Sequence, residues 1–153
     1  MLKHGITGFI DPRKMPRDQN SFPPVEEADF KRACFNAMQQ ANGKVVEIIA
    51  PAVAPNFYRA VVTIGSDAFE ILGHTIHRLI AFSAPIRGCF IVFIDCPELE
   101  PYFSQQGYEV LARAELMARP TMEALTLLGA AEIEQIKYWK AETNGEIAFN
   151  WFD

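Results

Sequence analysis

One amphipathic helix with clear boundaries is the feature of this sequence that most constrains the fold. Residues 30–41 repeat apolar side chains at steps of three and four, so one face of the helix is apolar and the other is polar. Pro24 suits a first-turn position, and Asn42 with Gly43 supplies the left-handed residue that ends a helix. Such a helix must bury its apolar face against a second layer.

That second layer is predicted to be a sheet, because the segments that follow are typical of strands. Residues 44–50 and 57–64 are rich in valine, isoleucine and aromatic residues, and the prolines between them predict a stiff loop. Residues 88–95 form the densest apolar run and are expected to be a buried strand. Residues 108–116 alternate moderately and are predicted to add a further strand.

Three more segments are predicted to be helices, and two segments stay ambiguous. The helices are expected at residues 98–106, 120–128 and 130–139. Residues 68–82 fit a helical stripe and a hairpin strand equally well. Residues 143–152 alternate as in a strand, which we favour, although Thr143 and Glu146 have the spacing of a capping box that begins a helix.

The order of these elements predicts an α+β fold rather than a doubly wound one, because strands and helices do not alternate regularly. A chain of 153 residues, half of them apolar, is long enough for one core. We expect a single domain with a mostly antiparallel sheet of about four to five strands packed against about three to four helices. Residues 1–24 contain four prolines and are predicted to be an N-terminal arm packed on the body, residues 25–153.

The cysteines and the N-terminus favour a cytoplasmic protein. The cysteines are three, an odd number, and the first residues lack the basic and apolar run of a secretory signal. No apolar stretch is long enough to span a membrane, so we expect no membrane association. The phosphate-binding glycine patterns and the serine-hydrolase elbow are absent from the sequence, so no cofactor is predicted.

The acidic side chains are concentrated in the last third of the chain. Residues 95–153 contain eleven carboxylate side chains against four basic ones, a net charge of −7. This balance disfavours nucleic acid as a partner and favours a basic protein. The alternative is an acidic surface that serves solubility alone.

Aromatic residues gather in the same stretch. Tyr138, Trp139, Phe149, Trp151 and Phe152 lie within fifteen residues, where they would be interface anchors if exposed and core residues if buried. The predicted partner-binding residues combine some of these rings with neighbouring acids, and they are Tyr138, Trp139, Glu142, Glu146, Trp151 and Asp153.

We therefore interpret the chain as a non-catalytic protein-binding module, such as an immunity or inhibitor protein that masks a basic partner, for example a nuclease toxin. The first alternative is a small enzyme that would use Cys96 as the nucleophile, with Asp95 beside it and His74 or His77 as the base. The two histidines alone are too few for a metal site, so none is predicted. The second alternative is a self-associating structural subunit, whose homo-oligomer contact would be the aromatic tail.

Overall fold

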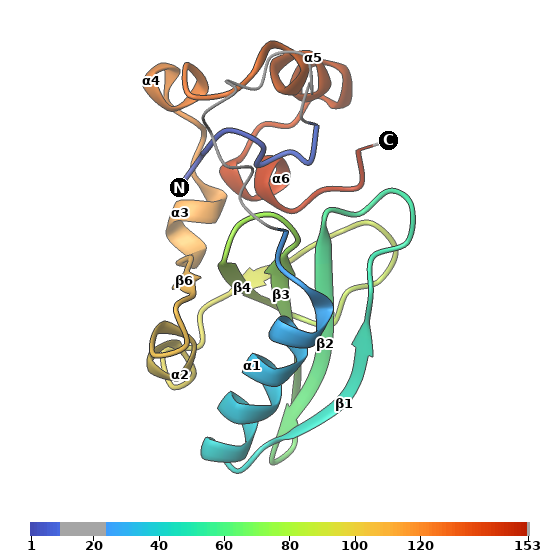
Figure 1. Cartoon of the computed structure of the whole chain (residues 1–153), viewed down its shortest axis with the longest axis vertical. Coiled ribbons are helices and arrows are strands. Elements are labelled where there is room, and N and C mark those ends of the chain that lie inside the picture. The colour runs from blue at the N-terminus through green and yellow to red at the C-terminus, as the bar shows by residue number, and fades with distance from the viewer. Residues whose placement is uncertain (10–23, 153) are drawn as a thin grey trace.

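The computed structural model describes residues 1–9 and 24–152, and in this part of the chain it has six helices and a six-stranded sheet (Figure 1). The predicted α+β class and mostly antiparallel sheet are confirmed, although the helices are more numerous and shorter than expected. The helices are α1 (Glu27–Gln40), α2 (Glu100–Ser104), α3 (Arg113–Met117), α4 (Met122–Leu125), α5 (Ala130–Trp139) and α6 (Asn144–Ala148). The strands are β1 (Lys44–Ile49), β2 (Phe57–Ile64), β3 (Asp67–His74), β4 (Leu79–Ser83), β5 (Phe93–Ile94) and β6 (Glu109–Val110).

The first five strands follow one another in chain order across the sheet, and each neighbouring pair is antiparallel. The short β6 pairs with β4 and runs parallel to it. Gly65 makes the turn between β2 and β3 with a φ of 58°, a left-handed conformation that glycine adopts without steric cost. All five residues of β4 are buried, as expected of a strand with neighbours on both sides and cover on both faces.

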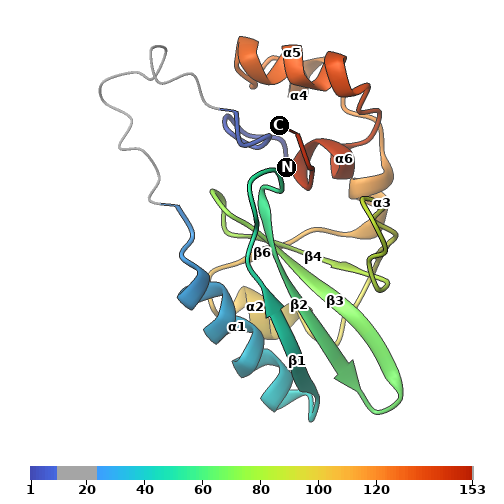
Figure 2. The same cartoon turned by 90° about the vertical axis from the view of Figure 1, so that its right-hand side faces the viewer.

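The helix α1 packs on one face of the sheet, with α2 beside it (Figures 1 and 2). Its apolar face contributes Phe30 and Met38 to a core cluster that also contains Phe82 and Phe103. The helix ends as the sequence predicts, because Asn42 has a φ of 54°. The predicted amphipathic helix is therefore confirmed, and it covers the lower part of the sheet in both views.

A second core cluster lies at the other end of the molecule, where residues 1–9 and the helices α3, α5 and α6 gather beyond the end of the sheet (Figures 1 and 2). Leu2 and Ile6 from the N-terminus pack there with Phe149 from the C-terminal segment. Ile136 is the buried apolar residue that α5 adds. Residues from the two ends of the chain thus share one core.

The predicted buried strand over residues 88–95 is wrong for most of its length. Only Phe93 and Ile94 are in a strand, and residues 84–92, which we call the β4–β5 loop, leave the sheet. Gly88 turns this loop with a φ of 67°, and an isolated bridge joins Arg87 to Phe90. An apolar run predicts burial only where the chain stays in the sheet, and here the turn carries the side chain of Phe90 into solvent.

The two ambiguous segments resolve in opposite ways. Residues 68–82 belong to the β3 and β4 hairpin and contain no helix. The strand that we favoured within residues 143–152 is wrong, because the segment begins with α6. The capping box decides it: Thr143 accepts a hydrogen bond from the amide of Glu146, and the Glu146 carboxylate accepts one from the amide of Thr143.

Three other predicted elements are shorter than expected, and one stays untested. The helix predicted at residues 98–106 shrinks to α2, and the helix predicted at residues 120–128 shrinks to α4. The strand predicted at residues 108–116 shrinks to β6 and gives way to α3. The helix predicted at residues 130–139 is confirmed as α5. Residues 10–23, which make up most of the predicted N-terminal arm, lie outside the described residues, so its packing on the body stays a prediction.

The contact between α1 and β3 depends on a glycine. A Cβ atom added to Gly73 would lie 2.3 Å from Cδ2 of Phe30, far inside the contact distance of two carbon atoms. We therefore expect Gly73→Ala to lower the free energy of unfolding by about 1–3 kcal/mol through overpacking, as measured by urea denaturation. Phe30→Leu removes the clashing ring, so Gly73→Ala should cost less in that background. An equal cost in both backgrounds would contradict this origin of the effect.

Candidate functional site

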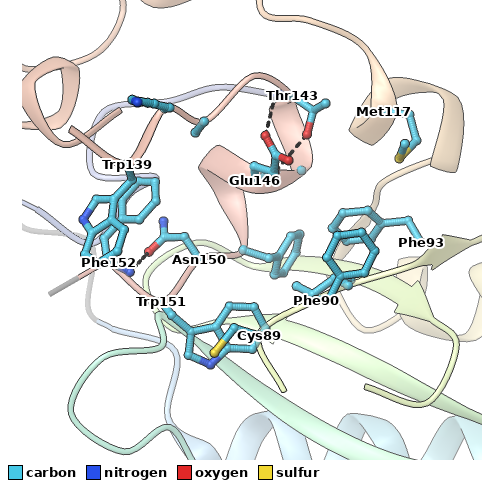
Figure 3. A pocket seen from close by; sticks show the side chains of 15 residues that line it. Cys89, Phe90, Phe93, Met117, Trp139, Thr143, Glu146, Asn150, Trp151 and Phe152 are labelled. Atoms are coloured by element: carbon cyan, nitrogen blue, oxygen red, sulfur yellow. Dashed lines mark hydrogen bonds between the residues drawn. The ribbon is translucent and has the colours of Figure 1, made fainter. Parts of the chain in front are cut away.

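A cavity of about 470 Å³ lies between the β4–β5 loop, the C-terminal end of α5, α6 and the segment that follows α6 (Figure 3). Its size is within the range of ligand sites in proteins. Trp139 and Phe152 stand on one side of it, and Phe90 and Phe93 stand on the other. The aromatic side chains that line the cavity are Phe90, Phe93, Trp139, Phe149, Trp151 and Phe152.

Contacts between rings fix the walls of this cavity. The ring of Trp139 stacks on that of Phe152, with centroids 5.9 Å apart and planes 2° from parallel. The ring of Trp151 meets that of Phe57 edge to face, with centroids 5.0 Å apart. Since Phe57 belongs to β2 and is buried, Trp151 joins the cavity wall to the sheet.

Local backbone structure positions the lining residues on α5 and α6. Lys140 ends α5 in the left-handed conformation, with a φ of 55°, and so turns the chain toward α6. Gly145 lets α6 approach the sheet closely, because a Cβ atom there would lie 2.4 Å from the ring of Phe93. The capping box of Thr143 and Glu146 then fixes the start of α6 at the edge of the cavity (Figure 3).

A partly buried ion pair anchors the β4–β5 loop. The Glu70 carboxylate accepts hydrogen bonds from Nε of Arg59 at 2.8 Å and from its terminal nitrogen at 3.1 Å. It also accepts one from the backbone amide of Ile86, three residues after the end of β4. The side chain of Glu70 is 3% exposed and that of Arg59 is 24% exposed, so a buried carboxylate with a partly exposed cation holds the loop to the sheet.

The edge of the cavity exposes apolar side chains to solvent. Phe90 is 75% exposed and Trp139 is 43% exposed, and Met117 and Val92 are exposed as well. Exposed rings around an apolar hollow are typical of surfaces that another molecule covers. We call this surface, formed by the cavity with Phe90, Val92, Met117 and Trp139, the aromatic groove.

The structure brings three of the predicted partner-binding residues into the aromatic groove. Trp139, Glu146 and Trp151 line the cavity. Tyr138 is exposed beside Trp139, with ring centroids 5.3 Å apart, and is not among the residues that line the cavity. Glu142 lies near Arg119, at 3.9 Å, and Asp153 lies outside the described residues.

The sequence analysis missed the contribution of the β4–β5 loop and α3. Cys89, Phe90 and Met117 all line the cavity, although none was a predicted site residue. Gly88 was the available signal, because a glycine at the start of an apolar run often marks a turn or bulge rather than a central strand.

The acidic residues of the segment 95–153 are distributed over several elements. Glu109 pairs with Lys3 at 3.2 Å, Glu115 lies 3.9 Å from the N-terminal amino group, and Glu132 is fully buried in α5. Two acids, Glu142 and Glu146, stand next to the aromatic groove. The acidic charge is therefore a property of the whole C-terminal third, and only part of it borders the cavity.

The candidate enzyme residues have structural partners of their own. Asp95 accepts a hydrogen bond at 2.7 Å from the amide of Arg113, at the start of α3. Burial, with a smaller contribution from the negative charge of Glu98, raises the pKa of the Cys96 thiol. In the described part of the chain, no hydrogen bond joins Cys96 to His74 or His77.

His74 is buried as a neutral side chain. Its Nδ1 accepts hydrogen bonds at 3.0 Å from the amides of Ile76 and His77, so its proton is on Nε2, which donates to the carbonyl of Ile6 at 2.8 Å. Burial lowers the pKa of His74 to about 4. Both ring nitrogens are thus engaged in holding the backbone.

No protein-family model matches the chain, and no curated protein and no solved structure is significantly similar to it. Within residues 1–9 and 24–152, the side chains of His, Cys, Asp and Glu form no group of three or more that would hold a metal ion. None of the helices described for this chain combines the length and apolar composition that crossing a bilayer requires.

The free energy of unfolding should fall as the pH is lowered from about 6.5 toward 4. His74 has a lower pKa in the folded protein than in the unfolded chain, so in this window the unfolded state binds more protons. The expected loss from this residue is about 3 kcal/mol, measured by urea denaturation at each pH. In His74→Asn, the amide oxygen replaces Nδ1 as acceptor without titrating. An equally steep pH dependence in that variant would contradict the assignment.

The three free thiols should differ in their reactivity toward a disulfide reagent. Cys89 is exposed, Cys96 is half-buried with a raised pKa, and Cys34 is fully buried with a raised pKa. We expect Cys89 to react at least about tenfold faster than Cys96, and Cys34 to react only on unfolding. Loss of the fast phase in Cys89→Ser identifies the residue. A fast phase that remains and belongs to Cys96 would support the enzyme alternative.

Proposed function

We propose that the chain is a protein-binding module whose aromatic groove receives an apolar side chain of a basic partner protein. The observation that carries this proposal is the exposed rim, since Phe90 and Trp139 leave large ring surfaces in water beside a cavity with aromatic walls. Buried aromatic anchors at the centre of an interface contribute most of the binding free energy in many complexes.

The rim favours a protein over a small molecule. A small ligand would fill the cavity of about 470 Å³ and leave the outward faces of Phe90 and Met117 in solvent. A protein surface would cover both the hollow and its rim. It would also leave the polar capping box of Glu146 at the edge, where polar groups surround the apolar centre of an interface.

The charge of the C-terminal third supports a basic partner. A net charge of −7 over residues 95–153 attracts a basic protein at long range, which raises the rate of association. Glu142 is 72% exposed at its side chain and stands close to the groove, so it can meet a lysine or arginine of the partner. An inhibitor that masks a basic protein such as a nuclease toxin is one form of this proposal. We propose the cytoplasm as the compartment, since all three cysteines are free thiols.

Selection of random displayed peptides against the folded protein tests the proposal directly. We expect the selected peptides to combine an aromatic or large apolar residue with lysine or arginine. Phe90→Ala should weaken their binding by about tenfold or more, because it removes an exposed anchor without disturbing the core. Met122→Ala is the matched control, since Met122 is 80% exposed on α4 and does not line the cavity.

Two outcomes would overturn the proposal. One is that no peptide is enriched, and the other is that the selected peptides bind Phe90→Ala as tightly as the unmodified protein. The basic character of the partner has a separate test, because affinity should fall with rising salt and fall again in Glu142→Gln. If binding is insensitive to both changes, the groove binds an apolar segment, and the proposal that the partner is basic is wrong.

The self-association alternative makes a different prediction for the same surface. If a second copy covers the aromatic groove, the mass measured by light scattering should rise with protein concentration, and Phe90→Ala should abolish the rise. The proposed function instead predicts a monomer at all concentrations. Trp151→Ala is a less clean variant, because the ring of Trp151 packs on the buried Phe57.

A further inference from the structure

Residues 1–9 lie between α5, the sheet end and the C-terminal segment (Figure 2), and they share one core cluster with all three. The segment is compact, because Ile6 and Gly8 donate backbone hydrogen bonds to Lys3 and Gly5. Ile6 is fully buried and Thr7 is 1% exposed. Residues 5–7 therefore belong to the interior, while Lys3 and His4 are exposed.

The first attachment of this segment is to α5. Glu132 is a buried carboxylate on α5, and its Oε1 accepts hydrogen bonds from the amide of Thr7 at 3.1 Å and from its hydroxyl at 3.0 Å. Its Oε2 accepts one from the amide of Gly129 at 2.9 Å and lies 3.5 Å from Nδ1 of His4. Without residues 1–9, one oxygen of a buried carboxylate would lose both of its partners, which is costly.

The second attachment is to the C-terminal segment. Asn56 immediately precedes β2. It donates from Nδ2 to the carbonyls of Ile6 and Ala148, both at 3.0 Å, and its Oδ1 accepts from the amide of Asn150 at 2.9 Å. Asn150 in turn donates to the carbonyl of Thr7 at 3.3 Å. One buried amide side chain thus joins the N-terminal segment, the sheet and the end of α6.

Both attachments lead to walls of the aromatic groove. The far end of α5 carries Trp139, and Oδ1 of Asn150 accepts a hydrogen bond at 3.0 Å from the amide of Phe152. Trp139 and Phe152 are the two rings that stack to form one side of the cavity. We propose that residues 1–9 act as a clasp that holds α5 and the C-terminal segment together and so sets the width of the aromatic groove.

Two buried histidines make the attachment of the clasp sensitive to pH. Nε2 of His74 is 2.8 Å from the carbonyl of Ile6, and Nε2 of His77 is 3.0 Å from the carbonyl of His4. The ionisable groups that face them are the two imidazoles themselves, Lys3 and His4 of the clasp, and Glu132 of α5. A proton added to Nδ1 of His74 would break the hydrogen bonds that this atom accepts from the amides of Ile76 and His77. Acid pH therefore weakens the contact between His74 and the clasp.

Amide hydrogen exchange of the full chain tests the clasp without any partner. Thr7→Val keeps the shape of the side chain and removes the hydroxyl that binds Glu132. We expect exchange of the α5 amides and of the Phe152 amide to accelerate by about tenfold or more, while β2 and β3 keep their protection. Thr63→Val is the matched control, because Thr63 lies in β2 at the opposite end of the sheet.

Acceleration confined to residues 1–9, with α5 unchanged, would overturn the proposal. The unmodified protein supplies an independent measurement if Thr7→Val does not fold. In native-state exchange at increasing urea, the amides of Thr7, α5 and Phe152 should open together as one unit. Opening of α5 while the Thr7 amide stays protected would also overturn it.

This proposal deepens the proposed function, because it concerns regulation of the same aromatic groove, yet its test does not depend on that function. A clasp shown by exchange stands even if no peptide is selected, and selected peptides stand even if α5 proves independent of residues 1–9. If the clasp and the peptide binding are both confirmed, the selected peptides should bind Thr7→Val and Thr63→Val with different affinities, Phe90 being unchanged in both variants.

Discussion

The upper half of the molecule depends on the hydrogen bonds of the Asn56 side chain. Asn56 is 7% exposed. Its amide nitrogen donates to main-chain groups and its amide oxygen accepts from one. These groups come from the first ten residues, the last ten residues and the end of α6. An apolar residue of similar size would leave the carbonyl of Ala148 and the amide of Asn150 without this partner, and the carbonyl of Ile6 with only His74, so apolar packing would not replace it.

This dependence divides the fold into two parts with different physical origins. The lower part, where α1 and α2 pack on the sheet, is held mainly by apolar contact, and α1 and strands β1 to β3 within it follow one another along the chain. The upper part contains the second core and the aromatic groove, and polar side chains such as Asn56, His74 and Glu132 assemble it from distant segments. Short helices such as α3 and α6 cannot stabilise themselves, and they exist because this assembly holds them.

The same division explains what the sequence analysis predicted well. The periodicity of α1, the β-branched residues of β1 and β2, and the spacing of α5 are local signals, and each led to a correct element. The predicted strand at residues 88–95 failed because burial is decided by contacts across the sheet, which an apolar run does not contain. Thr143 and Glu146 carried the correct local signal for α6, but the alternation of apolar residues was given more weight.

The site shows the same limit more sharply. Trp139 and Trp151 were identified because aromatic residues close in sequence can be seen together, whereas Phe90 lies far from them along the chain. The buried carboxylate of Glu132 was also invisible, since nothing near it in sequence shows that Thr7 supplies its hydrogen bonds. A residue type that is normally solvated becomes structural only when a distant segment satisfies it, and that segment here is the beginning of the chain. The groove is therefore lined by residues of the second half of the sequence, and its shape follows from how the two ends of the chain are joined.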